Sequence, residues 1–445
     1  MRILPKLAAA ALLLCAAPAM ATNGHQLIGV GGYQNSMGGA TTAAPYDTTT
    51  AVSNPAGLAM IEQKADFNFE AFMPKRSADF TGAGGQANEG GSPLYLVPAV
   101  GWTGEVTEDT YFGGGMFLIS GMGVDYDTID SVPFGAQQGD MTPWKANLYS
   151  QYQFWKLAPT LAHKYGDNLA VGVSLNIDYQ QMAFKQIYFN PNNPAQYMGA
   201  DLSRAGGAMG YGATIGGLYK VNEMFTVGAT YITQQTFADM EYRLSQGDVM
   251  MPANAQMSQW LMSGNGTYKM GMHFPQQVAI GVAVVPMAGL KLTADYKWIN
   301  FKSTHNSIDL KGNYAVVDPS TGQAVGSASA MPMNFGWDDV NVIAVGVEYA
   351  VNPLLTMRAG YNHGNSPIKE EDVFNNMIFP AIVTDHMSVG ADFRMGHNWE
   401  AGLAYMKAFK KEIKGSGDMM GQTSGALISL EENSFIVSIA YNYGK

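Results

Sequence analysis

Hydrophobic and polar residues alternate strictly along several stretches of this chain. Between Leu169 and Tyr179 the odd positions are apolar and the even positions are small or polar. Successive side chains of a β-strand point to opposite faces, so this segment has one apolar and one polar face. The same alternation recurs near 278–284 and 435–443. The pattern predicts β-strands that lie between an apolar and a polar environment.

Fourteen segments carry this strand pattern, and the connectors between them are short and long in turn. The predicted strands are 66–73, 95–105, 110–121, 148–164, 168–184, 206–221, 225–243, 273–286, 290–303, 340–351, 354–364, 384–395, 398–412 and 433–443. Short periplasmic turns that alternate with long extracellular loops are typical of outer-membrane β-barrels. The predicted fold is therefore an all-β transmembrane protein, a 14-stranded antiparallel outer-membrane β-barrel over residues 65–445.

The composition agrees with a membrane barrel and disfavours a soluble domain. Charged residues make up 14% of the chain, against about 25% in a typical soluble domain. After residue 21 no apolar run reaches the length of about 20 residues that a transmembrane helix needs. A closed barrel is the other structure that satisfies its own backbone hydrogen bonds in lipid. The chain has 25 Lys and Arg against 36 Asp and Glu, which argues against nucleic-acid binding because phosphate contacts need cations.

The first 21 residues have the features of a secretory signal peptide. Arg2 and Lys6 give a positive end, residues 7–17 are apolar, and Ala19-Met20-Ala21 offers small residues for cleavage. The run is too short for a membrane anchor. We expect the mature chain to start at Thr22. The only cysteine, Cys15, lies inside the signal peptide, so the mature protein has no disulfide.

Residues 22–64 do not have the strand pattern. The part from 22 to 44 is rich in Gly, Ala and Ser, and the part around Asn54 and Pro55 suits a short capped helix or a turn. A barrel of fourteen strands encloses a lumen too wide for wall side chains to fill. We therefore expect this compact segment to fold into the lumen as a hatch that plugs the barrel.

Short motifs carry a family resemblance across nearly the whole mature chain. The N-terminal ones are Thr22-Asn23-Gly24, Ile28-Gly29-Val30-Gly31, Met37-Gly38-Gly39-Ala40 and Asn54-Pro55-Ala56-Gly57, and weaker ones follow at 98–101, 113–115, 274–276, 294–296 and 358–361. Together they resemble the FadL family of outer-membrane transporters for long-chain fatty acids and hydrocarbons.

The resemblance implies a path for the ligand. Asn54, Pro55 and Ala56 match a motif of the family's hatch, which gates the channel. Gly113, Gly114 and Gly115 lie in the strand whose inward kink opens a side window in the family's barrels, and glycine tolerates such a bend. Two loops, near 185–205 and 244–272, correspond to the groove that first captures ligand. The ligand then enters a pocket above the hatch and leaves sideways into the bilayer.

The predicted extracellular loop 244–272 contains apolar residues that suit the first binding of a hydrophobic ligand: Met250, Met251, Met257, Trp260 and Leu261. Met adapts its shape to flexible apolar ligands. Pro252 is favoured at the first position of a helix, and Met257, Trp260 and Leu261 have the i, i+3, i+4 spacing of one helical face. The pattern predicts a short helix. The alternative is a loop that packs only on its neighbours.

Two cations on the predicted lumen face could pair with a ligand carboxylate. Strand parity places Lys297 and Arg358 there, and a charge-assisted hydrogen bond in a dry pocket would fix a fatty-acid head. The alternative is a structural network that lines a polar lumen. That network would comprise Lys297, Arg358, Asp178, Glu348, Asp392 and Glu400.

Signals for catalysis and for cofactors are missing from the sequence. It has no Gly-x-Ser-x-Gly or His-Glu-x-x-His motif, and its seven histidines show no metal-ligand spacing. The glycine-rich stretch 29–39 matches no nucleotide-binding loop. We expect no enzyme activity, no cofactor and no metal site.

The predicted function is passive transport of long-chain fatty acids or similar hydrophobic molecules across the outer membrane of a Gram-negative cell. The protein would act as a monomer in contact with outer-membrane lipid and lipopolysaccharide. An alternative within the family is an uptake channel for aromatic or alkane hydrocarbons. Alternatives of another class are a general porin, which would have an open lumen, and a barrel lipase.

Overall fold

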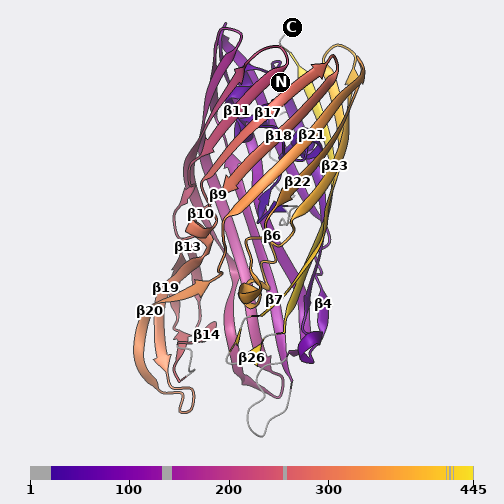
Figure 1. The fold of residues 1–445 in the computed structure, drawn as a ribbon. Coiled ribbons are helices and arrows are strands. Elements are labelled where there is room, and N and C mark those ends of the chain that lie inside the picture. The colour runs from indigo at the N-terminus through magenta and orange to yellow at the C-terminus, as the bar shows by residue number, and fades with distance from the viewer. Residues whose placement is uncertain are drawn as a thin grey trace, which may run out of the picture.

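The computed structural model describes residues 22–132, 143–253, 258–416, 418–419, 422–423 and 425–443. Its main feature is a barrel of antiparallel strands (Figure 1). The barrel strands are β3 (Lys64–Asp79), β5 (Tyr95–Thr107), β6 (Thr110–Val132), β7 (Trp144–Leu157) with its continuation β8 (Thr160–Tyr165), β9 (Leu169–Asn190), β10 (Asn193–Lys220), β11 (Phe225–Ile232), β17 (Gln277–Met287), β18 (Leu290–Ile299), β21 (Val340–Asn352), β22 (Leu355–Gly364), β23 (Asp385–Met395), β24 (Trp399–Lys414) and β27 (Leu427–Asn442).

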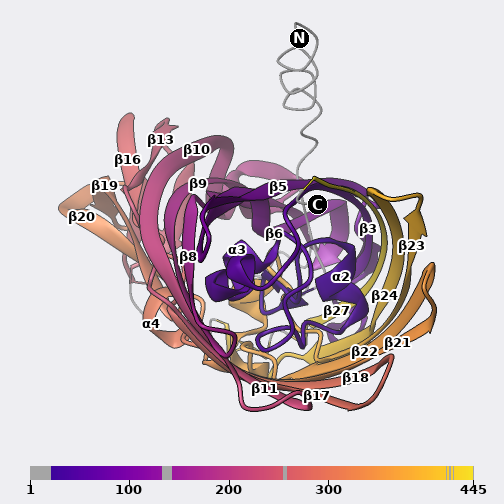
Figure 2. The same cartoon turned by 90° about the horizontal axis from the view of Figure 1, so that it is seen from above.

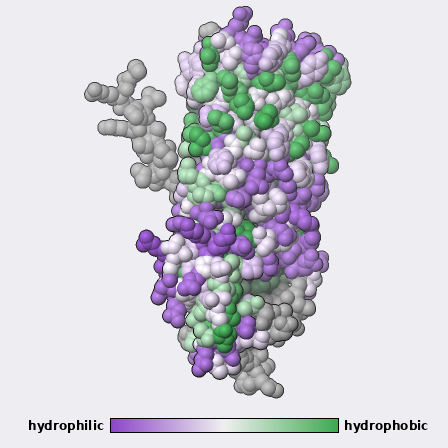
Figure 3. Space-filling view, turned by 90° about the vertical axis from the view of Figure 1, so that its left-hand side faces the viewer, coloured by the Kyte–Doolittle hydropathy of each residue, from purple (hydrophilic) through white to green (hydrophobic). Residues whose placement is uncertain are grey.

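The first and last barrel strands pair with each other and close the sheet. β27 runs antiparallel to β3 from Leu427 opposite Asp79 to Asn442 opposite Lys64. With β7 and β8 counted as one interrupted strand, the barrel has the fourteen strands that the sequence predicts. The alternation is confirmed as well, because between 169 and 180 of β9 the apolar residues are exposed and the intervening residues are buried. In Figure 3, hydrophobic side chains gather on the part of the barrel nearest the short turns.

The long connections form a second layer of structure at the opposite end of the barrel (Figure 1). They contain β4 (Ala87–Glu89), β12 (Thr236–Phe237), β13 (Met240–Leu244), β14 (Val249–Pro252), β15 (Trp260–Ser263), β16 (Gly266–Met270), β19 (Ser307–Val317), β20 (Ala324–Asn334), β25 (Asp418–Met419), β26 (Gln422–Thr423), the helix α4 (Lys302–His305) and the 3-10 turns η2 (Thr81–Ala83), η3 (Glu370–Asp372) and η4 (Phe374–Asn376). Among the described residues, no helix is long and apolar enough to cross a membrane.

The helix predicted from Pro252 onward is wrong. Pro252 ends β14 and lies opposite Trp260 of β15, and Met251 lies opposite Leu261. β14 also pairs with β10, and β15 also pairs with β19. Neighbouring strands therefore supply hydrogen-bond partners for the backbones of β14 and β15. Met257 lies outside the described residues. Strand partners that are distant in sequence therefore override the local helical spacing.

Residues 22–63 precede the first barrel strand and lie inside the barrel; we call them the N-terminal segment. Its elements are β1 (Thr22–Asn23), β2 (Gln26–Leu27), α2 (Gly31–Ser36), α3 (Thr50–Ser53) and η1 (Pro55–Ala59). Figure 2 shows α2 and α3 within the ring of strands. Nearly all of its side chains up to Ala59 are buried, so the segment packs closely within the ring of strands.

Candidate functional site

The Asn54-Pro55-Ala56 motif lies where the N-terminal segment meets the barrel wall. The amide nitrogen of Asn54 donates to the carbonyl oxygens of Thr42 (2.7 Å) and of Gly217 in β10 (3.1 Å). Its side-chain oxygen accepts from the backbone N–H of Ala56 at 3.3 Å and caps η1, which begins at Pro55. One side chain thus joins two turns of the segment to the wall.

Wall glycines allow the N-terminal segment to approach the strands closely. In seven barrel strands at least one glycine faces the segment such that an added Cβ would lie 2.0–2.7 Å from a segment atom. Such distances are well below van der Waals contact, so a larger residue would force the segment or the wall to shift. These wall glycines are Gly101 of β5, Gly172 of β9, Gly216 of β10, Gly228 of β11, Gly346 of β21, Gly360 and Gly364 of β22 and Gly390 of β23.

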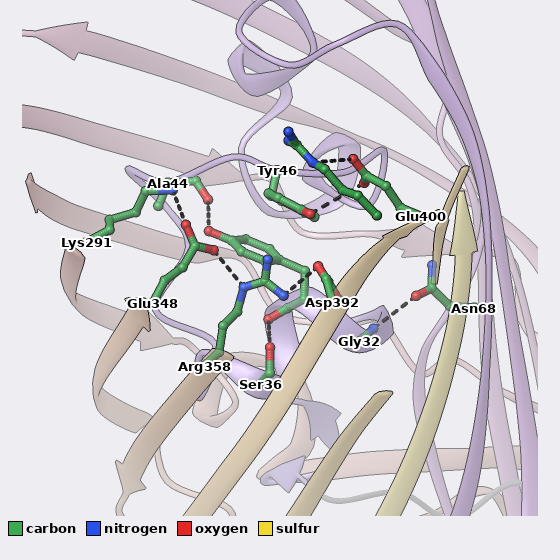
Figure 4. Close-up of polar contacts among 12 residues, drawn as sticks. Gly32, Ser36, Ala44, Tyr46, Asn68, Lys291, Glu348, Arg358, Asp392 and Glu400 are labelled. Carbon is green, nitrogen blue, oxygen red and sulfur yellow. Dashed lines mark hydrogen bonds and ion pairs between the residues drawn. The ribbon is translucent and has the colours of Figure 1, made fainter. Parts of the chain in front are cut away.

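Arg358 of β22 is the centre of a polar network between the wall and the segment (Figure 4). Its Nε lies 2.6 Å from Oε2 of Glu348, and its Nη1 lies 2.6 Å from Oδ2 of Asp392. The rings of Tyr33 and Tyr46 stack on each other with centroids 4.7 Å apart, and these centroids lie 4.8 and 4.5 Å from the guanidinium carbon. Arg358 is therefore engaged by wall carboxylates and by the segment, as in the structural alternative considered for the predicted cations.

The tyrosines and carboxylates around Arg358 extend this network. Lys291 lies 2.9 Å from Oε1 of Glu348, and the Tyr33 hydroxyl donates to the carbonyl oxygen of Ala44 at 2.8 Å (Figure 4). Burial raises the pKa of both Tyr33 and Tyr46 far above the usual range. Both rings thus stay neutral and present their electron-rich faces to the cation.

Strand β6 leaves the barrel wall part-way along its length. It pairs with β5 only as far as Phe117, opposite Ala99, and continues beside β7 with a register shift between Leu118 and Ser120. In place of β5, the N-terminal segment meets it there, where Gln26 of β2 pairs with Ser120. Residues 117–124 are buried on both faces, and Figure 2 places part of β6 inside the ring of the other strands. The wall between β5 and β6 is consequently interrupted at this level.

The glycine triplet 113–115 lies just before this departure. Gly113, Gly114 and Gly115 still pair with β5. Gly114 has a φ of 126°, and its added Cβ would lie 2.0 Å from the carbonyl oxygen of Ala158. Ala158 and Pro159 interrupt the neighbouring strand between β7 and β8. A proline has no backbone N–H to donate to a neighbouring strand. β6 and the β7–β8 strand are therefore both irregular at the same level of the barrel.

Lys297 borders a cavity of about 50 Å³ between the N-terminal segment and the wall, which we call the lumen cavity. Lys156, at the end of β7, lies on the same cavity. Neither side-chain ammonium forms an ion pair or a hydrogen bond with any residue that the structure describes. The rest of the lining is mixed: Ile119 of β6, Ile232 and Phe274 are apolar, whereas Thr230 and Gln277 are polar.

A larger cavity of about 260 Å³ lies among the long connections, and we call it the capture cavity. Met251 and Leu261 of the predicted capture loop line it, whereas Met250 and Trp260 do not. The rest of its lining is largely aromatic and methionine-rich and comes from the β9–β10 tip, β20 and the loop around η4. These residues include Phe184, Tyr188, Met198, Met331, Met333, Phe335, Phe374 and Ile378.

A histidine pair links the N-terminal segment to an extracellular connection. Nε2 of His25 lies 2.8 Å from Nε2 of His305 in α4, and Nδ1 of His25 contacts the Ser120 hydroxyl of β6. Burial lowers the pKa of His25 well below its usual range and the pKa of His305 to about 3. Sequence analysis did not find this pair because 280 positions separate the two residues.

Comparison with known proteins identifies the family. The family model described as outer membrane protein transport protein (OMPP1/FadL/TodX) matches residues 12–444. The chain belongs to this family. Members of the OMPP1/FadL/TodX family are outer-membrane transporters of hydrophobic compounds and not enzymes, so the predicted family, location and class of function are confirmed. The search of curated proteins found no match.

Solved structures of the family have the same fold. The Pseudomonas putida toluene transporter TodX aligns with a TM-score of 0.69 and 17% identity over 95% of this chain and 100% of TodX. The Ralstonia pickettii toluene transporter TbuX has a TM-score of 0.64 and 17% identity over 93% and 98% of the two chains. A Pseudomonas aeruginosa FadL homologue has a TM-score of 0.66 and 14% identity over 94% and 99%. At these identities the likeness is evidence of fold alone.

Proposed function

We propose that this family member carries long-chain fatty acids across the outer membrane by passive diffusion. The observation that carries the proposal is the pair Lys156 and Lys297 on the lumen cavity, which have no ion pair among the described residues. A buried cation, Lys156, and a half-buried one, Lys297, beside apolar side chains suit a ligand that has one carboxylate and a long hydrocarbon chain.

The proposed path uses the features in order from the outside. The capture cavity takes up the hydrocarbon chain, because its methionines and aromatic rings offer apolar contact. The carboxylate then moves to Lys156 and Lys297. Ile119 of β6 borders the same cavity, so the interruption between β5 and β6 offers a lateral exit into the bilayer. Movement of the N-terminal segment as a hatch, with Asn54 at its contact with the wall, gates the transfer.

Hydrocarbon uptake is the second candidate function. It is supported by the aromatic lining of the capture cavity, where the rings of Tyr188 and Phe374 stack with centroids 5.3 Å apart. TodX and TbuX, which share the fold, are described as toluene transporters. For such a ligand the only counter-charges near the two lysines, among the described residues, would be Asp178 beside Lys156 and Asp295 beside Lys297, both beyond ion-pair distance. We further propose that the protein acts as a monomer surrounded by lipid and lipopolysaccharide.

Uptake by cells that lack their own fatty-acid channel separates these functions. We expect the protein to raise uptake of labelled oleate. In a Lys156→Met, Lys297→Met double variant, oleate uptake should fall about tenfold or more, because a charge-assisted hydrogen bond contributes about 1.5–3 kcal/mol. Lys220→Met is the control, because Lys220 ends β10 away from the lumen cavity and pairs with the exposed Glu223. Uptake of labelled toluene should not change in the double variant. A wild-type protein that raises toluene uptake and leaves oleate uptake at background would establish the second candidate instead.

A further inference from the structure

A small buried site lies where the N-terminal segment begins, close to the part of β6 that has left the wall. It is bordered by Thr22, Arg76 of β3, residues 121–123 of β6, Pro380 and Glu432 of β27. The site thus brings together the start of the segment, the displaced strand, an extracellular loop and the seam between the first and last barrel strands.

Among the described residues, two carboxylates lack an ion-pair partner here: Glu432, which borders the site, and Glu70, which lies near Glu432 but does not line the site. Glu432 is 2% exposed and Glu70, on the adjacent strand β3, is 3% exposed. Oε2 of Glu432 and Oε1 of Glu70 have no hydrogen-bond partner, and neither carboxylate forms an ion pair within the described part of the chain. Burying a carboxylate without a partner is strongly unfavourable. Among the described residues, the site therefore has no cation within ion-pair distance of either carboxylate.

The nearby guanidinium does not meet this need. Arg76 donates from Nη1 to the Tyr95 hydroxyl at 3.1 Å and to the carbonyl oxygen of Gly123, and from Nη2 to the carbonyl oxygen of Ser92. Its contacts hold the loop after β3 against β6. Arg76 attracts Glu432 only from beyond ion-pair distance.

The backbone nitrogen of Thr22 is the group that contacts Glu432. Its N–H donates a hydrogen bond to the Glu432 carboxylate, and Thr22 itself is 2% exposed. Thr22 directly follows the Ala19-Met20-Ala21 motif that suits signal-peptide cleavage. In an uncleaved chain this nitrogen is a neutral amide with one proton to donate.

We propose that cleavage after Ala21 creates the missing cation, and that the α-ammonium of Thr22 forms a buried ion pair with Glu432. A signal peptidase would add water across the Ala21–Thr22 peptide bond, leaving a carboxylate on Ala21 and an ammonium on Thr22. The ammonium brings one positive charge and three donors to the site that Glu432 borders, with Glu70 as a second carboxylate nearby. Removal of the signal peptide would thereby lock the N-terminal segment to the wall beside β6.

Labelling of the purified protein with an amine-specific reagent at neutral pH tests this ion pair. Such a reagent modifies an α-amine in preference to lysine, because the ordinary pKa of an α-amine is about 7.7–8.0 and that of lysine about 10.4. Intact mass should place the mature N-terminus at Thr22. We expect its α-amine to react at least tenfold more slowly in the folded protein than in the unfolded chain.

Matched variants separate the ion pair from simple burial. Glu432→Gln keeps the shape of the side chain and should raise the labelling rate at least fivefold, whereas Glu431→Gln, the neighbouring position paired with Lys407, should leave it unchanged. If Glu432→Gln fails to fold, an Ala inserted between Ala21 and Thr22 moves the amine one residue away and should raise the rate likewise. A mature N-terminus elsewhere, or an α-amine that reacts equally fast in wild type and both variants, would overturn the proposal. Uptake plays no part in this test, so its outcome is independent of the transported ligand.

Discussion

Arg358 holds together groups from the wall and from the N-terminal segment that could not stay buried without it. Glu348 and Asp392 each lie 2.6 Å from its guanidinium. Removing one member of a buried ion-pair network leaves uncompensated charge, at a cost of about 3–5 kcal/mol. At this scale the arginine is a structural residue.

Arg358→Met should therefore lower the thermal unfolding temperature of the detergent-solubilised protein by several degrees. The unfolding temperature of Arg358→Lys should lie between those of the wild type and Arg358→Met, because an ammonium keeps the charge but cannot bind two carboxylates with the geometry of a guanidinium. Lys220→Met serves again as the surface control. An unchanged unfolding temperature for Arg358→Met would contradict a structural role for the network.

The His25–His305 pair predicts a loss of stability in mild acid. The folded state keeps His305 neutral down to a pKa of about 3, whereas the unfolded chain takes up a proton near the ordinary value of 6.5. Below pH 6.5 the unfolded state thus binds more protons, and stability falls by about 1.4 kcal/mol per pH unit for each such histidine. Above pH 6.5 this contribution does not change.

Thermal unfolding at pH 7.5 and pH 5.0 measures this effect. Between pH 7.5 and pH 5.0 the unfolding temperature of the wild-type protein should fall further than that of His305→Gln, because glutamine cannot titrate. His397→Gln, at an exposed turn, should behave as wild type. The same pH dependence in all three proteins would show that other groups cause it.

At the scale of elements, the fit between the N-terminal segment and the strands depends on where glycine occurs in each strand. Gly216 and Gly217 are neighbours in β10, yet an added Cβ would lie 2.0 Å from Oδ1 of Asn54 at the first position and no closer than 3.9 Å to any neighbouring atom at the second. The two positions thus form a matched pair for testing whether the segment closes the lumen.

Gly216→Ala should displace the Asn54 turn and open the lumen, and Gly217→Ala should not. In planar bilayers we expect larger or more frequent ion-conducting openings for Gly216→Ala than for the wild type. Equal conductance for both variants would mean that the contact at Asn54 does not gate the channel.

The barrel strands could be predicted from the sequence because each one meets lipid on one face and the lumen on the other. That contrast imprints a period of two, as in β9 from Leu169 to Gln180. Where the contrast ends, the prediction loses its basis. The strands β9 and β10 continue to Asn190 and from Asn193, while the predicted strands stopped at 184 and began at 206. The section of β6 buried on both faces has no alternation for the same physical reason.

The candidate site was predictable only in part, because most of it forms from contacts between distant positions. Family resemblance led to the Asn54 motif and to the glycine triplet of β6, and strand parity led to Lys297. Lys156 lies on the same cavity as Lys297 but comes from the other side of the barrel. The position of Lys156 on the lumen cavity depends on how β6, β7 and the N-terminal segment fold against one another. Nothing local in the sequence marks such a residue.

At the scale of the whole molecule, the barrel is much taller on one side than a bilayer requires. A tilted transmembrane strand needs about 9–11 residues, whereas β9 has 22 and β10 has 28. At about 3.3 Å per residue, β10 is roughly 90 Å long. The capture cavity includes Met198 and Tyr188 from the far part of this pair, so it lies well beyond the lipid headgroups.

On the proposed path, this height would place the entrance within the sugar layer that covers the outer surface of a Gram-negative cell. Apolar solutes cross that hydrated polysaccharide slowly, since it offers them no favourable contacts. A receptor opening raised on the long β9–β10 hairpin meets such solutes before they must cross it. The same height leaves the tips of the hairpin accessible to antibodies and phage, which makes them the part of the molecule most exposed to selection from outside the cell.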